Sequence, residues 1–214
     1  MTHAIPSLTR VPATEKGVTI ADFLVPIRVG ERVSPRLRSV ILVVTGALLI
    51  YLTARVAIPV PGTPVPFTLQ NVGILVVGGA LGMRRGGLAA LLYVALGVVG
   101  LPFFAEGRGG PSVILGATGG YLVGFVLAAA LVGRLAELGW DRRIGGAIGA
   151  TALGTAAIYL VGVPWLAVVT GLSLGEAIAT GLAPFLVADI VKLLVAAAVF
   201  PAAWWVVGRR PSER

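Results

Sequence analysis

The sequence predicts an all-α integral membrane protein with six transmembrane helices. Of its 214 residues, 57% are hydrophobic and 12% are charged, whereas about 25% of the residues in a soluble domain are charged. Residues 144–175 contain no Asp, Glu, Lys, Arg or His, and about 20 apolar residues cross a bilayer. The absence of a period-2 alternation argues against a membrane β-barrel.

Six hydrophobic segments fit between the charged positions. The second and third are short, which predicts tilted or broken helices. The long connection 101–118 is predicted to be partly re-entrant, because irregular backbone at membrane depth needs protein or a cavity around it. The predicted spans are 37–58, 67–82, 86–104, 117–138, 144–169 and 184–207.

The basic residues predict the orientation. Fourteen of the 17 lysines and arginines lie on one side of these spans, which the positive-inside rule makes cytoplasmic. We therefore expect a multi-pass protein of the plasma membrane with both termini in the cytoplasm. This orientation accounts for the basic charge, so no nucleic-acid partner is expected. The fourteen are Arg10, Lys16, Arg28, Arg32, Arg36, Arg38, Arg84, Arg85, Arg134, Arg142, Arg143, Arg209, Arg210 and Arg214.

The predicted organisation is one membrane domain between two tails. Residues 1–36 form a cytoplasmic tail, partly disordered, with a short interfacial helix around 19–27. Residues 37–207 form the six-helix domain, and 208–214 form the C-terminal tail.

The chain lacks the residues that several kinds of catalytic, metal and nucleotide sites require. The chain has no cysteine, and its one histidine, His3, lies in the N-terminal tail. No thiolate metal site or histidine base is therefore expected in the membrane domain, and no catalytic residue, metal or cofactor is predicted. There is no G-x-x-x-x-G-K-[ST] motif, and the glycine-rich run 107–120 lacks the strand-to-helix context of a phosphate loop. We therefore expect the chain to have no ATPase of its own and not to be an enzyme.

Two charges fall inside the sixth span. Asp189 and Lys192 are three residues apart, so they lie on one face of a helix. They are roughly 8 and 12 Å below its outer end at about 1.5 Å per residue. A charge at this depth costs roughly 2.5–3.5 kcal/mol on insertion scales.

Three interpretations of this pair remain open. It is a ligand site reached from outside, a structural ion pair, or a proton relay or Schiff-base lysine. As a ligand site, carboxylate acceptors and ammonium donors suit a neutral group that carries both N–H and C=O, such as a urea or an amide.

A ligand carboxylate would need its own partner. Arg108 is the only cation in the outer connections, and Arg55, near the outer end of the first span, competes for the same role. A solvated pair between Arg108 and Glu106 is the alternative for Arg108.

The proline-rich run 59–66 precedes Phe67, Thr68 and Gln70. Proline fixes the backbone, so the run can serve as a stiff lid over an outward site, with Phe67 as an apolar wall and Thr68 and Gln70 as polar groups. A rigid connector between helices is the alternative.

Four stretches together resemble the BioY family, the biotin-binding S components of energy-coupling factor (ECF) transporters. Their order and spacing make the resemblance specific, and it extends over about residues 40–207. The stretches are IPVPGTPVPFTLQ (58–70), GGALGMRRGG (78–87), YVALGVVGLPFFAEGRGGPSVILGATGGYLVGF (93–125) and PFLVADIVK (184–192).

The resemblance implies an S-component bundle that captures biotin from outside. It implies delivery inward with a transmembrane T component and two ATPase subunits as partners. Asp189 and Lys192 match the family residues expected to hold the ureido ring. Ala117, where the family often has proline, and Thr53-x-x-x-Ala57, in place of a clear Ala-x-x-x-Ala motif, depart from the family pattern.

The predicted substrate-binding residues come from these motifs and from the outer cations. They are Asp189, Lys192, Gln70, Thr68, Phe67, Tyr93, Phe103, Arg108 and Tyr121. The alternatives are an S component for another small vitamin, an intramembrane enzyme and an assembly protein.

Overall fold

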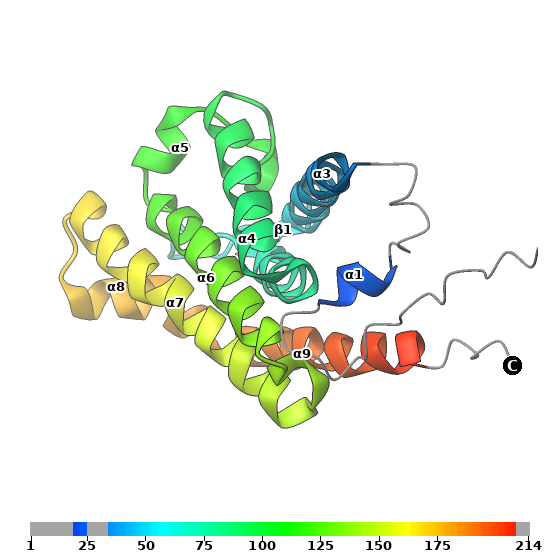
Figure 1. Ribbon diagram of the computed structural model, residues 1–214. Coiled ribbons are helices and arrows are strands. Elements are labelled where there is room, and N and C mark those ends of the chain that lie inside the picture. Colours follow the sequence, from blue (N-terminus) through cyan, green and yellow to red (C-terminus); the bar gives the residue numbers. More distant parts are fainter. Residues whose placement is uncertain (1–18, 25–33, 209–214) are drawn as a thin grey trace, which may run out of the picture.

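The structure, a computed structural model, describes residues 19–24 and 34–208. Apart from one short strand pair, its regular elements are helices (Figure 1). Five helical stretches of this part are long and apolar enough to cross a membrane, so the chain is a multi-pass membrane protein. They are α3 (Pro35–Ala54), α4 (Gln70–Val98), α6 (Gly119–Glu137), α7 (Ile144–Thr170) and the stretch Leu174–Val206.

Helix α4 reverses its direction at Gly82. This residue has φ 83° and ψ 175°, outside the helical region, and a positive φ favours glycine. In a straight helix, Gly78 and Gly86 would lie about 12 Å apart along the axis. Here a Cβ atom added to Gly86 would lie only 2.8 Å from the Cα of Gly78. The segments 70–81 and 83–98 are therefore two arms packed against each other.

The α4 hairpin occupies the middle of the bundle. It packs against α3 and α6, α6 packs against α7, and α9 (Leu186–Gly208) lies against α4 and α7. Small residues permit these close approaches: a Cβ on Gly78 would lie 2.5 Å from the carbonyl oxygen of Ala129, and one on Gly133 would lie 2.4 Å from the backbone of Gly82. Such contacts favour association of helices within a membrane.

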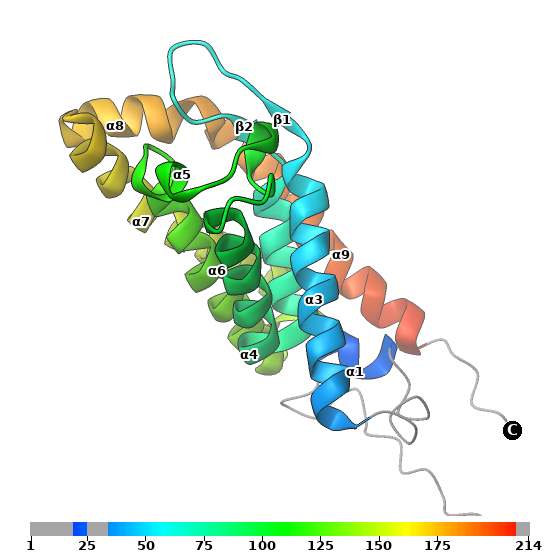
Figure 2. The same cartoon turned by 90° about the horizontal axis from the view of Figure 1, so that it is seen from above.

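One end of the bundle carries the irregular segments (Figure 2). Strands β1 (Ala57–Ile58) and β2 (Phe67–Thr68) pair antiparallel, and residues 57–68 together form what we call the proline-rich arm. Residues 99–118, the α4–α6 segment, contain η1 (Ala105–Gly107) and α5 (Pro111–Leu115). Helix α8 (Leu174–Gly181) and η3 (Ala183–Phe185) precede α9.

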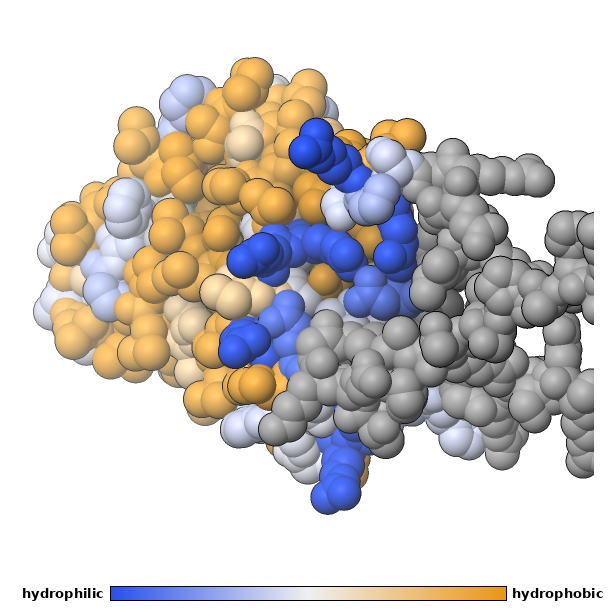
Figure 3. Space-filling model, viewed as in Figure 1, coloured by the Kyte–Doolittle hydropathy of each residue, from blue (hydrophilic) through white to orange (hydrophobic). Residues whose placement is uncertain are grey.

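The opposite end carries α1 (Ile20–Leu24) and η2 (Trp140–Arg142). Ile20 is buried in a cluster with Phe200 and Trp204 of α9. The indole Nε1 of Trp204 donates to the buried carboxylate of Asp141 at 2.7 Å, which holds the end of α9 to η2. Hydrophilic residues gather toward this end in Figure 3, and hydrophobic residues cover most of the remaining face in view.

The predicted helical segments correspond to observed helices, with three corrections. The second and third predicted spans are the two arms of α4, and the segment 99–104 is not helical because Gly100 has φ 115° and Pro102 follows. The first and second predicted spans also extend into strands: Ala57 and Ile58 lie in β1 after α3 ends at Ala54, and Phe67 and Thr68 lie in β2. Helix α8 was not predicted.

The tails lie largely outside the described residues. Helix α1 falls within the short helix predicted around 19–27, of which 25–27 are not described. His3 and the C-terminal tail after Gly208 are outside the described part, and the domain boundaries stay a prediction.

We predict that Asp22 stabilises the α1 end at neutral pH. Its Oδ1 lies 2.9 Å from Arg85 and 3.4 Å from Arg38. Burial raises the pKa of Asp22, but hydrogen bonds from Arg85 and Thr19 outweigh this effect and lower the pKa below its ordinary value of 3.8. Interactions that lower the pKa of a carboxylate stabilise the folded state at pH values above its unfolded-state pKa. This stabilisation is lost as the pH falls through the folded-state pKa.

Asp22→Asn should therefore lower the melting temperature more at pH 7 than at pH 3, which is below the ordinary pKa of 3.8. The pair is partly exposed, so the expected loss is about 1 kcal/mol or less. Thermal unfolding in detergent at both pH values measures it, and Glu106→Gln at the other end of the bundle is the control for a lost negative charge. An equal loss at both pH values would contradict the role of the ion pairs.

Candidate functional site

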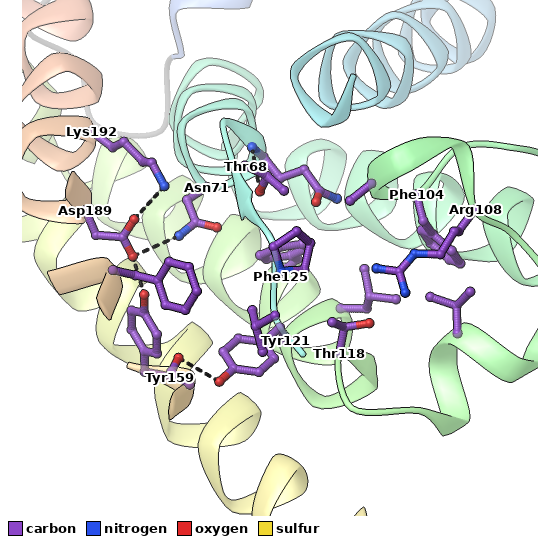
Figure 4. A pocket seen from close by; sticks show the side chains of 18 residues that line it. Thr68, Asn71, Phe104, Arg108, Thr118, Tyr121, Phe125, Tyr159, Asp189 and Lys192 are labelled. Atoms are coloured by element: carbon purple, nitrogen blue, oxygen red, sulfur yellow. Dashed lines mark hydrogen bonds and ion pairs between the residues drawn. The ribbon is translucent and has the colours of Figure 1, made fainter. Parts of the chain in front are cut away.

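The irregular end of the bundle contains a pocket of about 620 Å³, counted to its open mouth. Its walls come from the proline-rich arm, the start of α4, the α4–α6 segment, α6, α7 and the region from α8 to α9 (Figure 4). The lining residues are Val65, Pro66, Thr68, Gln70, Asn71, Phe104, Ala105, Arg108, Val113, Thr118, Tyr121, Leu122, Phe125, Tyr159, Gly181, Phe185, Asp189 and Lys192.

Asp189 and Lys192 form an ion pair at one side of this pocket. Both lie on α9 and are 4% and 6% exposed, and Lys192 Nζ lies 2.7 Å from Asp189 Oδ1. The i, i+3 spacing therefore brings the two groups together as the sequence predicts. The ammonium also lies 3.8 Å from the centroid of the Phe67 ring, so the proline-rich arm covers the cation.

Two further donors hold the other carboxylate oxygen of Asp189. Asn71 Nδ2 donates to Oδ2 at 3.3 Å, and the Tyr159 hydroxyl donates to the same oxygen. The carboxylate is thus bonded from α4, α7 and α9 together. Asn71 and Tyr159 are not among the residues predicted for the site. Their signal was weak: Asn71 follows Gln70 directly, and Tyr159 is a polar-tipped side chain inside the uncharged run 144–175.

Arg108 lies at the far side of the pocket from this pair, beyond Phe125 and Tyr121 in Figure 4. Its side chain is 44% exposed and forms an ion pair with Glu106 at 3.2 Å. Both interpretations of Arg108 thus have a geometric basis, because it lines the pocket and pairs with Glu106. The competing residue Arg55 is not among the lining residues, and its guanidinium lies 5.9 Å from the Tyr51 ring.

The other predicted residues divide into two groups. Thr68, Gln70 and Tyr121 line the pocket, and the Tyr121 hydroxyl donates to the carbonyl of Gly181 at 2.8 Å. Tyr93 and Phe103 are not lining residues. They lie behind the wall, where the Tyr93 hydroxyl donates to the Phe103 carbonyl at 3.1 Å.

Apolar side chains lie between the two charged sides. Phe104 comes from the α4–α6 segment, Phe125 from α6 and Phe185 from η3. The pocket therefore suits an elongated ligand with a neutral polar head at Asp189 and Lys192, an apolar middle and an anionic end near Arg108. Among the described residues, no group of three or more His, Cys, Asp or Glu side chains could hold a metal ion.

The chain matches one protein family over most of its length. The model of the BioY family matches residues 26–209. The chain belongs to the BioY family. The matched range includes every element from α3 to α9 and leaves α1 outside it.

Named BioY relatives and a solved structure agree with this assignment. The chain is 42% identical over 142 residues to the biotin transporter BioY of Thermotoga maritima, covering 66% of this chain and 82% of the relative. It is 40% identical over 161 residues to the biotin transporter BioY of Rhodobacter capsulatus, covering 70% and 83%. These relatives are named as transporters and not as enzymes.

The similar solved structure is a crystal structure of the S-component for biotin from an ECF-type ABC transporter. It matches with a TM-score of 0.72 at 26% identity, over 79% of this chain and 92% of that chain. The BioY chain described here therefore has the fold of an S component.

We predict that the two charges of the buried pair depend on each other for stability. Lys192→Met leaves the Asp189 carboxylate buried without its cation, which should cost about 3–5 kcal/mol. Asp189→Asn/Lys192→Met removes both charges and keeps an oxygen for Tyr159 and Asn71, so it should recover most of the loss. Thermal unfolding in detergent compares the variants. A double variant less stable than Lys192→Met would mean that the ion pair itself stabilises the fold.

Proposed function

We propose that this BioY-family protein binds biotin in the pocket between α9 and the α4–α6 segment and serves in its uptake. The observation that carries the proposal is the buried Asp189–Lys192 pair at one side of a pocket whose other side holds Arg108. The names of its relatives, biotin transporters in two bacteria, support the choice of ligand.

The ureido ring of biotin matches the chemistry of the α9 side. It has two N–H donors and one carbonyl acceptor, while Asp189 supplies acceptor oxygens and Lys192 supplies donors. Asn71 lines the same side and has an amide oxygen in addition to the nitrogen that bonds Asp189. The bicyclic ring would then lie against Phe125, and the valerate chain would extend toward Phe104 and Arg108.

We further propose that the protein works with an ECF T component and two ATPase subunits. The chain has no phosphate-loop motif of its own, and the similar solved structure is an S-component of an ECF-type ABC transporter. Delivery inward would then use ATP hydrolysis by those partner subunits.

The proposed topology has six crossings with both termini in the cytoplasm of a plasma-membrane protein. The reversal at Gly82 supports counting the two arms of α4 as separate crossings. Arg38, Arg85 and Arg142 lie at the α1 end, as the positive-inside rule requires for a cytoplasmic side. The pocket at the opposite end would then open outward.

We predict that the purified protein binds biotin without ATP and hydrolyses no ATP. Isothermal titration calorimetry measures the binding, and phosphate release measures the hydrolysis. Asp189→Asn/Lys192→Met, which should stay folded, is expected to bind biotin at least tenfold more weakly, because it loses a carboxylate acceptor and the ammonium donors. A folded wild-type sample that binds no biotin would refute the proposal.

We predict that Arg108 contacts the carboxylate of biotin. Arg108→Ala should weaken biotin binding but hardly affect a biotin amide, which lacks the charge. The expected difference is about 1 kcal/mol or less for an exposed contact, and about 1.5–3 kcal/mol for a desolvated one.

Arg55→Ala is the matched control, since Arg55 is the competing cation of the same end. A charge-specific loss in Arg55→Ala alone would mean that the biotin carboxylate lies near the end of α3 and not near Arg108. Equal losses for biotin and its amide in Arg108→Ala would mean that the substitution disturbs the α4–α6 segment instead.

A further inference from the structure

The hydroxyl of Tyr93 lies behind the pocket, between its two irregular walls. Tyr93 belongs to the second arm of α4 and is 0% exposed. The hydroxyl accepts a hydrogen bond from Gln70 Nε2 at 2.5 Å and donates one to the Phe103 carbonyl at 3.1 Å. A hydroxyl can do both at once, because it has one donor and two acceptor sites.

The Gln70 bond reaches the proline-rich arm. Gln70 is buried and lines the pocket, and its backbone N–H donates to the Thr68 hydroxyl at 3.3 Å. Thr68 is paired with Ala57 in the short strand pair, and the neighbouring Phe67 covers the Lys192 ammonium. The position of Gln70 is therefore connected to that of the whole arm.

The Phe103 bond reaches the α4–α6 segment. The Phe103 ring stacks on Tyr51 at 4.5 Å between centroids, and the Phe104 ring meets the Tyr93 ring edge-on at 5.8 Å. The backbone N–H of Phe104 donates to the Arg108 carbonyl at 3.0 Å, which closes the turn that carries Arg108. Fixing Phe103 therefore fixes the wall formed by Phe104 and Arg108.

We propose that the Tyr93 hydroxyl is a positioning group that fastens the proline-rich arm and the α4–α6 segment to one point, and so sets how often the pocket opens. When both walls are closed, the Gln70 amide and the Phe103 carbonyl have their partner in this hydroxyl. Without it, the buried Gln70 amide and the partly buried Phe103 carbonyl would lose this partner in the closed form but would be hydrated in the open form. The loss would shift the equilibrium toward opening. The role of Tyr93 in opening does not depend on which ligand binds, and only the identity of that ligand rests on the proposed function.

The test measures opening in the absence of ligand. Because the chain has no cysteine, single cysteines can serve as reporters at Val65 of the arm and Ala105 of the α4–α6 segment. Both line the pocket and are 9% and 7% exposed. Tyr93→Phe keeps the ring and should raise the rate of maleimide labelling about tenfold at both reporters, as expected for unpaired buried polar groups. A cysteine at Ala128, buried in α6, should stay unreactive and controls for general unfolding.

A second variant separates the two bonds. Gln70→Leu removes the bond between Tyr93 and the start of α4, next to the proline-rich arm, and leaves the one to Phe103, so only the Val65 reporter should label faster. If the cysteine at position 128 also labels faster in Tyr93→Phe, that variant is generally unfolded. Gln70→Leu then tests the proposal. Unchanged labelling at both reporters in Tyr93→Phe, or equal acceleration at both in Gln70→Leu, would overturn the proposal.

Ligand exchange gives an independent measurement. Tyr93→Phe should raise the dissociation rate of biotin about tenfold, because the pocket opens more often. If the wild-type protein binds no biotin, the proposed ligand fails, but the labelling rates of the ligand-free protein still test the role of Tyr93. A dissociation rate equal to that of the wild type would contradict the proposal.

Discussion

A buried carboxylate within an apolar helix needs several donors at once, and the arrangement around Asp189 supplies them. Lys192 bonds one oxygen from the same helix, while Asn71 and Tyr159 bond the other from α4 and α7. Removing a charge from water costs several kcal/mol unless such bonds replace its hydration. The carboxylate therefore connects α9 to α4 and α7 and holds the polar side of the pocket in one arrangement.

Backbone rigidity at the pocket end complements this network. Prolines stiffen the proline-rich arm, whose strand pair fixes Phe67 over Lys192. The reversal of α4 at Gly82 lies at the other end and lets both arms of the helix contribute to one site. The first arm of α4 provides Gln70 and Asn71, and its second arm provides Tyr93. A straight α4 would place Gln70 and Tyr93 about 34 Å apart along its axis.

The sequence predicted most of the fold because long apolar segments are clearly separated by charged positions along it. The i, i+3 spacing of Asp189 and Lys192 also predicted their contact, since this distance is set within one helix. Tyr93 shows where such reasoning stops: its residue type suited a ligand contact, but tertiary packing places it behind the wall. Tyr159 was missed because its partner is 30 residues away on another helix. Helix α8 did have a local signal, the capping box of Ser173 and Glu176.

The hydrogen bonds that Asp189 makes within the protein limit how a ligand can bind in the pocket. A carboxylate has about four acceptor sites, and those of Asp189 already serve Lys192, Asn71 and Tyr159. Under the proposed function, a ureido N–H of biotin would therefore use the remaining site or displace one of these donors. A ligand carbonyl at Lys192 must share the ammonium with the Phe67 ring 3.8 Å away. Under the proposed function, binding at the polar side would act on β2 and through it on the proline-rich arm, which leads into Gln70 and its bond to Tyr93. The contacts of Asp189 and Lys192 are thus connected, through the Phe67 ring and the strand pair, to the hydrogen bonds of Tyr93.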